Sequence, residues 1–432
     1  MQKYKNNLLI KNIIILFTTG VLAKILGMIS KIMQTNILGI KIISLYALTT
    51  PVLMLIITIC QFSFQISISK LSAENKYNNK KLLLSAFKIG IIVDLLLILL
   101  VLFTSKYIAL LIHHKNLKTV IEIMCPVIPL ITITSIQRGF LYGKEDMFLS
   151  SITNIIEELI KIILIIFILP IAIYYSDILT LKLLFLFNIL IELVTMIILN
   201  KNISKYINNN EKNTYKIHKK ILGISIPTTL IRLISATGYF LEPIILINAL
   251  LELNYNINYI TLEYGVITSY IIPILSFPNF FSMLIASALL PNITKLYNNK
   301  QYEDFNKKIA VSLFITIIIG IMSFIFILIF AKYILKYLYN TNLGINYIRI
   351  LGPFFILIYI QPILSIILQA TEKTNILLII SIINTFSKYI SLFIFCNIGL
   401  GINSLIVSMI ISIITTTILL LICITKLINK RI

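Results

Sequence analysis

The chain has 432 residues, of which 59% are hydrophobic and only 12% are charged, and its mean hydropathy is +0.99. Soluble domains carry about 25% charged residues, so this chain has too few charges to build the polar shell of a soluble core. Lipid must therefore contact most of its surface, which excludes a soluble enzyme or binding module.

The net charge of +21 does not by itself indicate a nucleic-acid partner. No basic patch lies on a soluble module, and lysines in the loops of a membrane protein face anionic lipid headgroups. The four cysteines lie in or beside apolar runs without CxxC spacing, so we expect neither disulfides nor a metal site. Motifs for nucleotide binding (GxxxxGK[ST]), zinc proteolysis (HExxH) and serine hydrolysis (GxSxG) do not occur. We expect no catalytic residue, no metal and no cofactor, and hence not an enzyme.

Twelve apolar stretches are near the length that crosses about 30 Å of hydrocarbon. They lie at roughly 12–34, 42–69, 82–104, 119–141, 150–172, 178–200, 220–248, 260–290, 309–331, 347–369, 375–396 and 402–425. The first stretch has no small-residue cleavage site and is predicted to be a span, not a signal peptide. Prolines cluster in the seventh and eighth spans, where they predict helix kinks.

The charge of the loops predicts how these spans are oriented. Twelve spans place both termini on one side, and most lysines and arginines fall in the loops of that side. The opposite loops contain six: Lys41, Lys106, Lys115, Lys118, Lys332 and Lys336. The positive-inside rule therefore predicts a multi-pass protein of the cell membrane with both termini in the cytoplasm.

The chain divides into two similar halves. A polar stretch at 201–219 leaves six spans on each side, so we expect a lobe at 1–200, a basic cytoplasmic linker at 201–219 and a lobe at 220–432. A shift of 227 residues aligns Pro126 with Pro353, Glu145 with Glu372, and Lys161 with Lys388. Because six is an even number, both halves have the same topology. The predicted fold is an all-α membrane protein of two six-helix lobes related by a pseudo-twofold axis along the membrane normal.

Charged residues within the spans mark the candidate site, since each costs roughly 2.5–3.5 kcal/mol to insert without a partner, a wet cavity or a ligand. Cations outnumber acids. Lys24 and Lys31 are two helical turns apart and share one face of the first span. Glu157 and Lys161 have the i,i+4 spacing of an ion pair, an alternative to a role in binding. The remaining cations are Lys88, Lys182, Arg232, Arg349 and Lys388, and the remaining acids are Asp94, Glu158, Glu192 and Glu242.

Several segments resemble the stage V sporulation protein B family, a branch of the multidrug/oligosaccharidyl-lipid/polysaccharide (MOP) exporter superfamily. The resemblance runs through essentially the whole chain. Its main segments are GVLAKILGMISKIMQTNILG (20–39), SLYALTTPVLMLIITICQFSFQISISKLSAE (44–74), QRGFLYGKEDM (137–147), IIEELIKI (155–162), IPTTLIRLISATGYFLEPIIL (226–246) and ILQATEKTNILLIISIINTFSKYISLFI (367–394).

The resemblance implies a flippase that moves an undecaprenyl-diphosphate-linked saccharide by alternating access, such as a peptidoglycan precursor for the spore cortex. Related lipid II flippases use basic residues in the first span and the central cavity. Lys24 and Lys31 match the first-span positions, and Arg232 matches a position in the seventh span.

We therefore expect the diphosphate to bind Lys24, Lys31, Arg232, Lys161 and Lys388 between the lobes. A cationic cavity selects an anionic cargo, and a guanidinium binds phosphate through two parallel hydrogen bonds. The alternative is a multidrug or cation antiporter of the same superfamily, with the ion or proton site at Asp94, Glu157, Glu192 and Glu242. A third class is a membrane partner of a cell-wall synthase that transports nothing. The expected partners are a lipid-linked glycan, membrane lipids and cell-wall synthases, with no nucleic acid.

Overall fold

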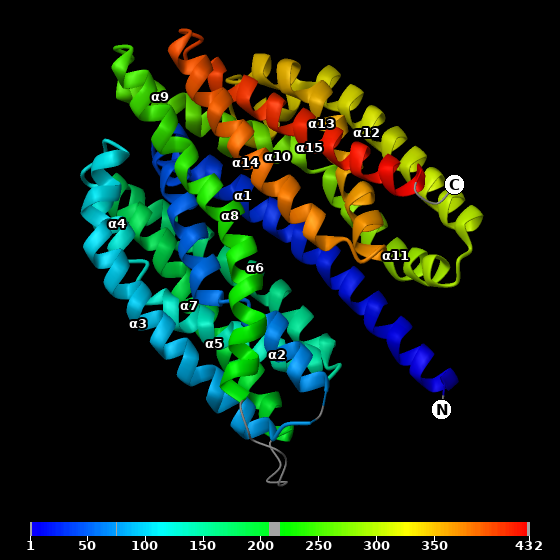
Figure 1. The fold of residues 1–432 in the computed structure, drawn as a ribbon. Coiled ribbons are helices and arrows are strands. Elements are labelled where there is room, and N and C mark those ends of the chain that lie inside the picture. Colours follow the sequence, from blue (N-terminus) through cyan, green and yellow to red (C-terminus); the bar gives the residue numbers. More distant parts are fainter. Residues whose placement is uncertain (1, 75, 207–216, 430–432) are drawn as a thin grey trace. The chain divides into compact units, whose positions relative to one another are not determined.

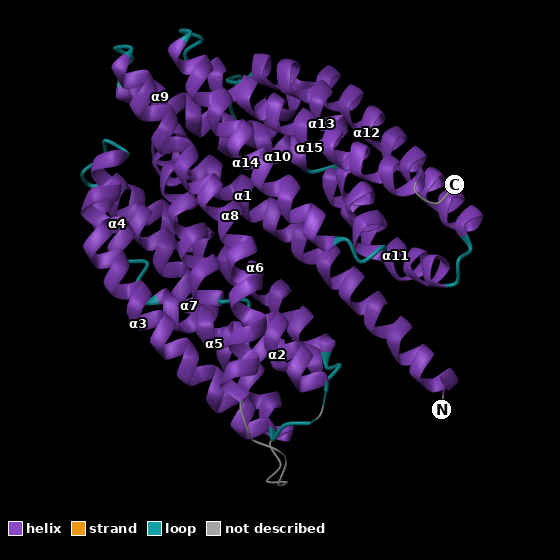
Figure 2. Ribbon diagram, viewed as in Figure 1, coloured by secondary structure: helices purple, strands orange, loops and turns teal. Residues whose placement is uncertain are grey.

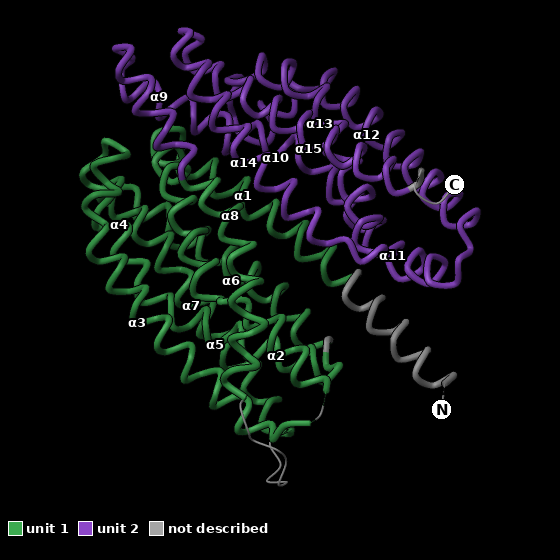
Figure 3. Tube along the Cα trace, viewed as in Figure 1, with its two compact units in different colours: residues 1–240 green, residues 241–432 purple. Residues whose placement is uncertain are grey.

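The computed structural model describes residues 2–74, 76–206 and 217–429, and nearly all of them are helical. No β-strand occurs within these ranges (Figures 1 and 2). The chain divides into two compact units, residues 1–240 and 241–432 (Figure 3). The all-α class expected from the sequence is therefore correct.

Unit 1 contains the first half of the spans. Its elements are α1 (Gln2–Gln61), α2 (Phe64–Ala73), α3 (Asn79–Leu111), α4 (Leu117–Glu122), α5 (Val127–Gly143), α6 (Met147–Ile173), α7 (Asp177–Ile203) and the short helix η1 (Ser204–Tyr206). The side chain of Asn78 caps α3 by accepting from the amide of Lys81, and Ser176 caps α7 in the same way through Leu179.

Unit 2 contains the second half, and α8 (Ile217–Glu252) runs across the boundary between the units. Its further elements are α9 (Ile257–Gly265), the π-helical turn η2 (Val266–Ile271), α10 (Ile272–Ser276), α11 (Asn279–Asn298), α12 (Tyr302–Tyr339), α13 (Ile345–Ala370), α14 (Thr374–Asn397) and α15 (Asn403–Asn429).

Eleven helical segments of the described chain are long and apolar enough to span a membrane. The segment Thr18–Ala73 holds the first two predicted spans, which Gly39 separates by a kink at φ +66. Only glycine adopts that conformation without steric cost. The fifth predicted span is α6, which is long enough but has Glu157, Glu158 and Lys161 close together.

The eighth predicted span, 260–290, is not one continuous helix. It is divided into α9, η2, α10 and α11. Pro273 and Pro278 lack the amide proton that an uninterrupted α-helix needs, and the chain between α10 and α11 forms tighter turns instead. The predicted interruption by proline is therefore found in the eighth span, whereas the seventh, which contains Pro227 and Pro243, is the single helix α8.

The second unit begins at residue 241, which is 21 residues, or about six helical turns, later than the expected start of the second lobe at 220. The first half of α8 belongs to unit 1 because it packs on α2. The Ser225 hydroxyl donates to Ser67 Oγ over 2.8 Å, and the Thr229 hydroxyl donates to Ser63 Oγ over 3.1 Å. Of the expected linker, residues 207–216 lie outside the described residues, and 201–206 are helical.

The turns after α5 and α13 have the same conformation, which supports the duplication. Glu145 and Glu372, the aligned glutamates, have positive φ angles of 62° and 58°. In each turn the glutamate amide donates to the carbonyl three residues earlier over 3.1 Å. The following amide, of Asp146 or Lys373, donates to the carbonyl five residues earlier, over 3.0 and 2.8 Å. Such local identity follows if both halves derive from one six-span unit.

Candidate functional site

Three of the expected lysines lie close together in unit 1, on two helices that pack along each other. Lys24 and Lys31 are on α1, and Lys161 is on α6. Lys24 and Lys161 are both near enough to Lys31 to repel its ammonium group. Among the described residues, no carboxylate oxygen lies within 4.0 Å of any of these three ammonium nitrogens. We call Lys24, Lys31 and Lys161 the lysine cluster.

Glu158 lies against the same face of α1. Its Oε2 accepts a hydrogen bond of 3.0 Å from the buried Ser30 hydroxyl. A Cβ atom on Gly27 would lie 3.2 Å from Glu158 Oε1, so the missing side chain gives the carboxylate room beside α1. Glu158 offsets part of the positive charge nearby, but one acid cannot neutralise three lysines. It was not among the expected site residues.

Arg232 lies on α8 next to a helix break. It is exposed, and its Nη2 donates to Gln61 Oε1 over 2.6 Å. Gln61 is the last residue of α1, and the two following residues, Phe62 and Ser63, both adopt left-handed φ angles. A guanidinium has five N–H donors. Within the described chain this is its one side-chain hydrogen bond, so Arg232 retains donors for a ligand.

Lys388, in contrast, has an acidic partner. Its ammonium forms an ion pair with Glu242 on α8, and Glu242 is only 1% exposed. The sequence placed Lys388 among free cations because no acid lies four residues away. The partner comes from 146 residues away, and the positive charge of Lys388 is neutralised within unit 2. Glu242, which the sequence predicted as an ion or proton site, forms the other half of this ion pair.

Glu157 pairs with a residue that the sequence did not place among the buried charges. Its carboxylate forms an ion pair with Arg138 of α5 and accepts a hydrogen bond of 2.7 Å from Thr195. Arg138 also donates to Asn154 Oδ1 over 2.6 Å. The expected alternative, a pair between Glu157 and Lys161, does not form among the described ion pairs. Arg138 lies within the predicted span 119–141, and this position in the sequence could have identified it as a charged residue inside the membrane.

Glu192 completes a charged network in unit 1. Its Oε2 accepts a hydrogen bond of 2.7 Å from the Thr134 hydroxyl. The Glu192 carboxylate also interacts electrostatically with Glu157 and with Arg138. Of the two carboxylates, only Glu157 forms an ion pair with Arg138, and Glu192 has no ion pair among the described residues.

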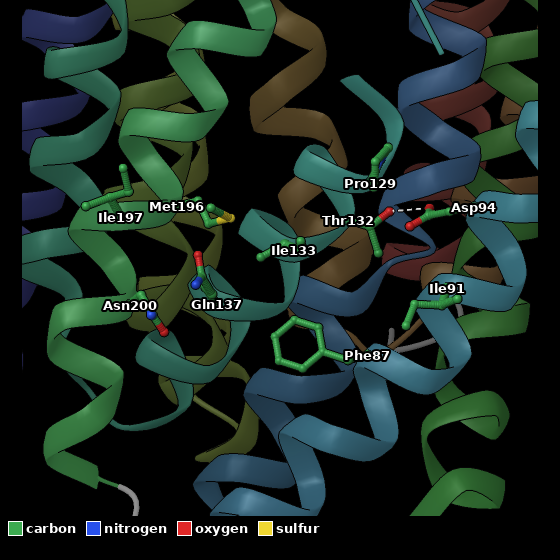
Figure 4. Close-up of a pocket in the computed structure, with 10 residues that line it drawn as sticks. All are labelled: Phe87, Ile91, Asp94, Pro129, Thr132, Ile133, Gln137, Met196, Ile197 and Asn200. Carbon is green, nitrogen blue, oxygen red and sulfur yellow. Dashed lines mark hydrogen bonds between the residues drawn. The ribbon is translucent and has the colours of Figure 1, made fainter. Parts of the chain in front are cut away.

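Asp94 borders a separate cavity of about 410 Å³ formed by α3, α5 and α7. Figure 4 shows its hydrogen bond with Thr132 at one end of this cavity, and Gln137 on the side of Met196 and Asn200. The oxygen of the buried Gln137 amide has no hydrogen-bond partner among the described residues. The other walls are apolar: Phe87, Ile91, Pro129, Ile133 and Ile197.

Thr132 connects Asp94 to the break after α1. Its hydroxyl oxygen lies 2.6 Å from Asp94 Oδ1 and 3.0 Å from the carbonyl oxygen of Cys60. A hydroxyl has a single proton, so it donates to one of them at a time. An ionised Asp94 accepts the hydrogen bond from Thr132. A protonated Asp94 donates to Thr132 instead, and the hydroxyl then donates to the carbonyl oxygen of Cys60 or, over 3.2 Å, to that of Ile128.

These features define a polytopic helical membrane protein with a duplicated bundle and ionised groups inside its spans. The model of the polysaccharide biosynthesis protein family matches residues 9–297, and the MatE model matches residues 267–394. The chain belongs to the polysaccharide biosynthesis protein family, within the MOP superfamily.

Two curated relatives come from Bacillus subtilis (strain 168). Stage V sporulation protein B is 25% identical over 394 residues, covering 88% of this chain and 76% of the relative. Sporulation protein YkvU is 25% identical over 364 residues, covering 82% and 81%. The family expected from the sequence is thereby confirmed.

Solved structures show the same fold. The lipid II flippase MurJ in an inward closed conformation matches with a TM-score of 0.72 and 17% identity, over 95% of this chain and 87% of that one. An inward-facing multidrug resistance MATE family transporter matches with a TM-score of 0.67 and 17% identity, over 92% of each chain. These structures define the fold of this chain as that of MOP transporters.

Proposed function

We propose that the protein is a flippase for an undecaprenyl-diphosphate-linked saccharide in the cell membrane, with both termini in the cytoplasm. The diphosphate binds the lysine cluster, Lys24, Lys31 and Lys161, together with Arg232. The polyprenyl tail remains in the bilayer while alternating access exposes the headgroup to either side. The saccharide is a peptidoglycan precursor or another lipid-linked glycan.

The observation that carries this proposal is the lysine cluster itself. Lys24 and Lys161 both repel the ammonium group of Lys31, and none of the three lysines has an acidic partner among the described ion pairs. Such an arrangement costs folding free energy unless water or an anion compensates it. A diphosphate supplies that anion, and its several oxygens accept hydrogen bonds from more than one lysine at once.

The names of the relatives fit this class of cargo. The family is one of polysaccharide biosynthesis, two curated relatives are sporulation proteins, and one solved structure of the same fold is a lipid II flippase. A protein path is needed because moving sugar hydroxyls through hydrocarbon without hydrogen bonds costs several kcal/mol for each group.

The test is flipping of an undecaprenyl-diphosphate-linked saccharide in proteoliposomes that contain the purified protein. We expect Lys31→Gln to reduce the flipping rate at least tenfold, because it removes the central charge of the cluster and keeps a polar side chain. Lys24→Gln and Arg232→Gln are expected to act in the same direction.

Lys332→Gln is the matched control, since Lys332 is an exposed lysine on α12 and has no described ion pair. It should leave the rate unchanged. A wild-type rate in the Lys31, Lys24 and Arg232 variants, all shown to be inserted and folded, would remove the cationic site from the mechanism.

The cavity at Asp94 favours a second candidate function, export of a lipophilic cation in exchange for protons. A carboxylate at the end of a largely apolar cavity suits a cation with an apolar body. This candidate predicts efflux of a lipophilic cation that stops in Asp94→Asn and continues in Lys31→Gln. The opposite pattern supports the flippase.

A further inference from the structure

Unit 2 contains a cavity of about 430 Å³ between α11 and α13. Its volume falls in the range of small-molecule sites, roughly 300–1,000 Å³. Five of its lining side chains are polar and none is charged: Asn279, Ser287, Gln361, Ser365 and Gln369. We call these five residues the amide pocket.

The pocket forms a polar stripe on α13. Gln361, Ser365 and Gln369 follow one another at four-residue steps, so they share one face of that helix. The chain has only eight glutamines, and two of them meet here. The asparagine-rich composition of the chain does not explain this concentration of glutamine.

The polar groups of the pocket are not used to join the two helices. Gln361 donates through Nε2 to Thr417 Oγ1 over 3.1 Å, which ties its amide to α15. The Oδ1 atom of Asn279 is buried without a partner. Across the described residues, no side-chain hydrogen bond runs between the α11 and α13 members of the pocket. Interhelical hydrogen bonding, the usual structural role of such residues in membranes, therefore accounts for Gln361, which binds α15, but not for Asn279, Ser365 or Gln369 among the described hydrogen bonds.

The rim of the pocket differs from the lipid-facing surface of the same unit. The exposed side chains of α12 are apolar, with Phe314 64% and Met322 66% exposed. At the pocket, Ser287 and Gln369 are exposed beside the apolar Met283, which is 57% exposed. Exposed amides and hydroxyls are costly against hydrocarbon, so we expect the part of the rim formed by Ser287 and Gln369 to face water.

We infer that the amide pocket binds the uncharged glycan of the lipid-linked saccharide. An amide both donates and accepts hydrogen bonds, as each sugar hydroxyl does. The absence of charge among the lining residues suits a neutral polyol and not a phosphate. The polar stripe lies toward the C-terminal end of α13, which is the cytoplasmic end in the proposed orientation and the side on which the saccharide enters. This inference rests on the proposed function.

The experiment compares two ligands by native mass spectrometry of the full-length protein in detergent. One is undecaprenyl diphosphate, and the other is undecaprenyl diphosphate carrying one N-acetylhexosamine. The variant is Gln369→Ala with Ser365→Ala, whose side chains make no hydrogen bond among the described residues. Each neutral hydrogen bond contributes a few-fold to affinity, so we expect the variant to bind the glycan lipid about tenfold more weakly and the sugar-free lipid unchanged.

The controls separate this inference from the proposed function. Gln301→Ala removes an exposed glutamine outside the pocket and should change neither affinity. Ser365→Phe, which fills the cavity, should give the same selective loss as the double variant. Equal effects on both lipids, or none on either, would overturn the glycan assignment while leaving the diphosphate site intact. If the wild-type protein binds neither lipid, the proposed function fails and this inference fails with it.

Discussion

The ion pair between Lys388 and Glu242 offers a direct test of how the two halves differ. Glu242 is 1% exposed and Lys388 is 22% exposed. Removing one member of a buried ion pair typically costs about 3–5 kcal/mol, because the other charge is left without a partner. For a unit of this size, a loss of that order lowers Tm by about 6–20 °C. We expect Lys388→Met and Glu242→Gln each to destabilise the protein by this amount.

The double variant Lys388→Met/Glu242→Gln should recover most of the stability, because no unpaired charge remains. Thermal unfolding of the four proteins in detergent gives the coupling free energy. The matched control is Lys161→Met, which changes the aligned lysine of unit 1. Lys161 has no described acidic partner and repels Lys31, so its removal should leave Tm unchanged or raise it.

Transport by the same variants tests the role of Lys388. We expect the double variant to flip the saccharide at a near wild-type rate, because a lysine neutralised by glutamate does not hold a diphosphate. An unchanged Tm in Lys388→Met would refute the pairing argument. If a fully stable double variant lost transport, Lys388 would belong to the binding site, as the sequence predicted.

Three further predictions concern unit 1. Arg138→Met should lower stability by about 3–5 kcal/mol, and adding Glu157→Gln should restore most of it, as measured by thermal unfolding. Asp94→Asn keeps a hydrogen-bonding partner for Thr132, so the protein should stay folded in thermal unfolding, and the proposed flippase should keep its flipping rate because Asp94 is not part of the cationic site. Gly139→Ala should cost about 1–3 kcal/mol, because its Cβ would lie 2.8 Å from the α2 backbone, whereas Gly223→Ala, with no atom within 4 Å, should not.

The spans were predictable because hydropathy is a local property. Each span needs about 20 apolar residues, and that length can be read without knowing what the span packs against. The duplication was also visible, since aligned residues such as Glu145 and Glu372 keep the same turn. The break at Phe62 and Ser63 had no such signal, because neither residue is glycine or proline.

Ion-pair partners were not predictable from spacing. The i,i+4 rule favoured Glu157 with Lys161, but such a pair on one helix contributes only about 0.2–0.5 kcal/mol. Leaving Arg138 unpaired within the bundle would cost several times more, so Glu157 pairs with Arg138 on the neighbouring helix. Lys388 and Glu242 are likewise joined by packing between distant helices, which a single sequence does not encode in any local pattern.

Duplication gives two copies of one scaffold, and single charges then distinguish them. Lys161 and Lys388 occupy aligned positions on α6 and α14, yet only Lys388 meets a carboxylate. One acid on α8 thus neutralises Lys388 in unit 2, while the aligned Lys161 of unit 1 remains in the lysine cluster. The cavity of unit 2 is correspondingly lined by neutral amides and hydroxyls. In the proposed function the cargo has an anionic diphosphate and an uncharged glycan, and these need different surfaces. We propose that divergence at Glu242 lets each unit supply one of them.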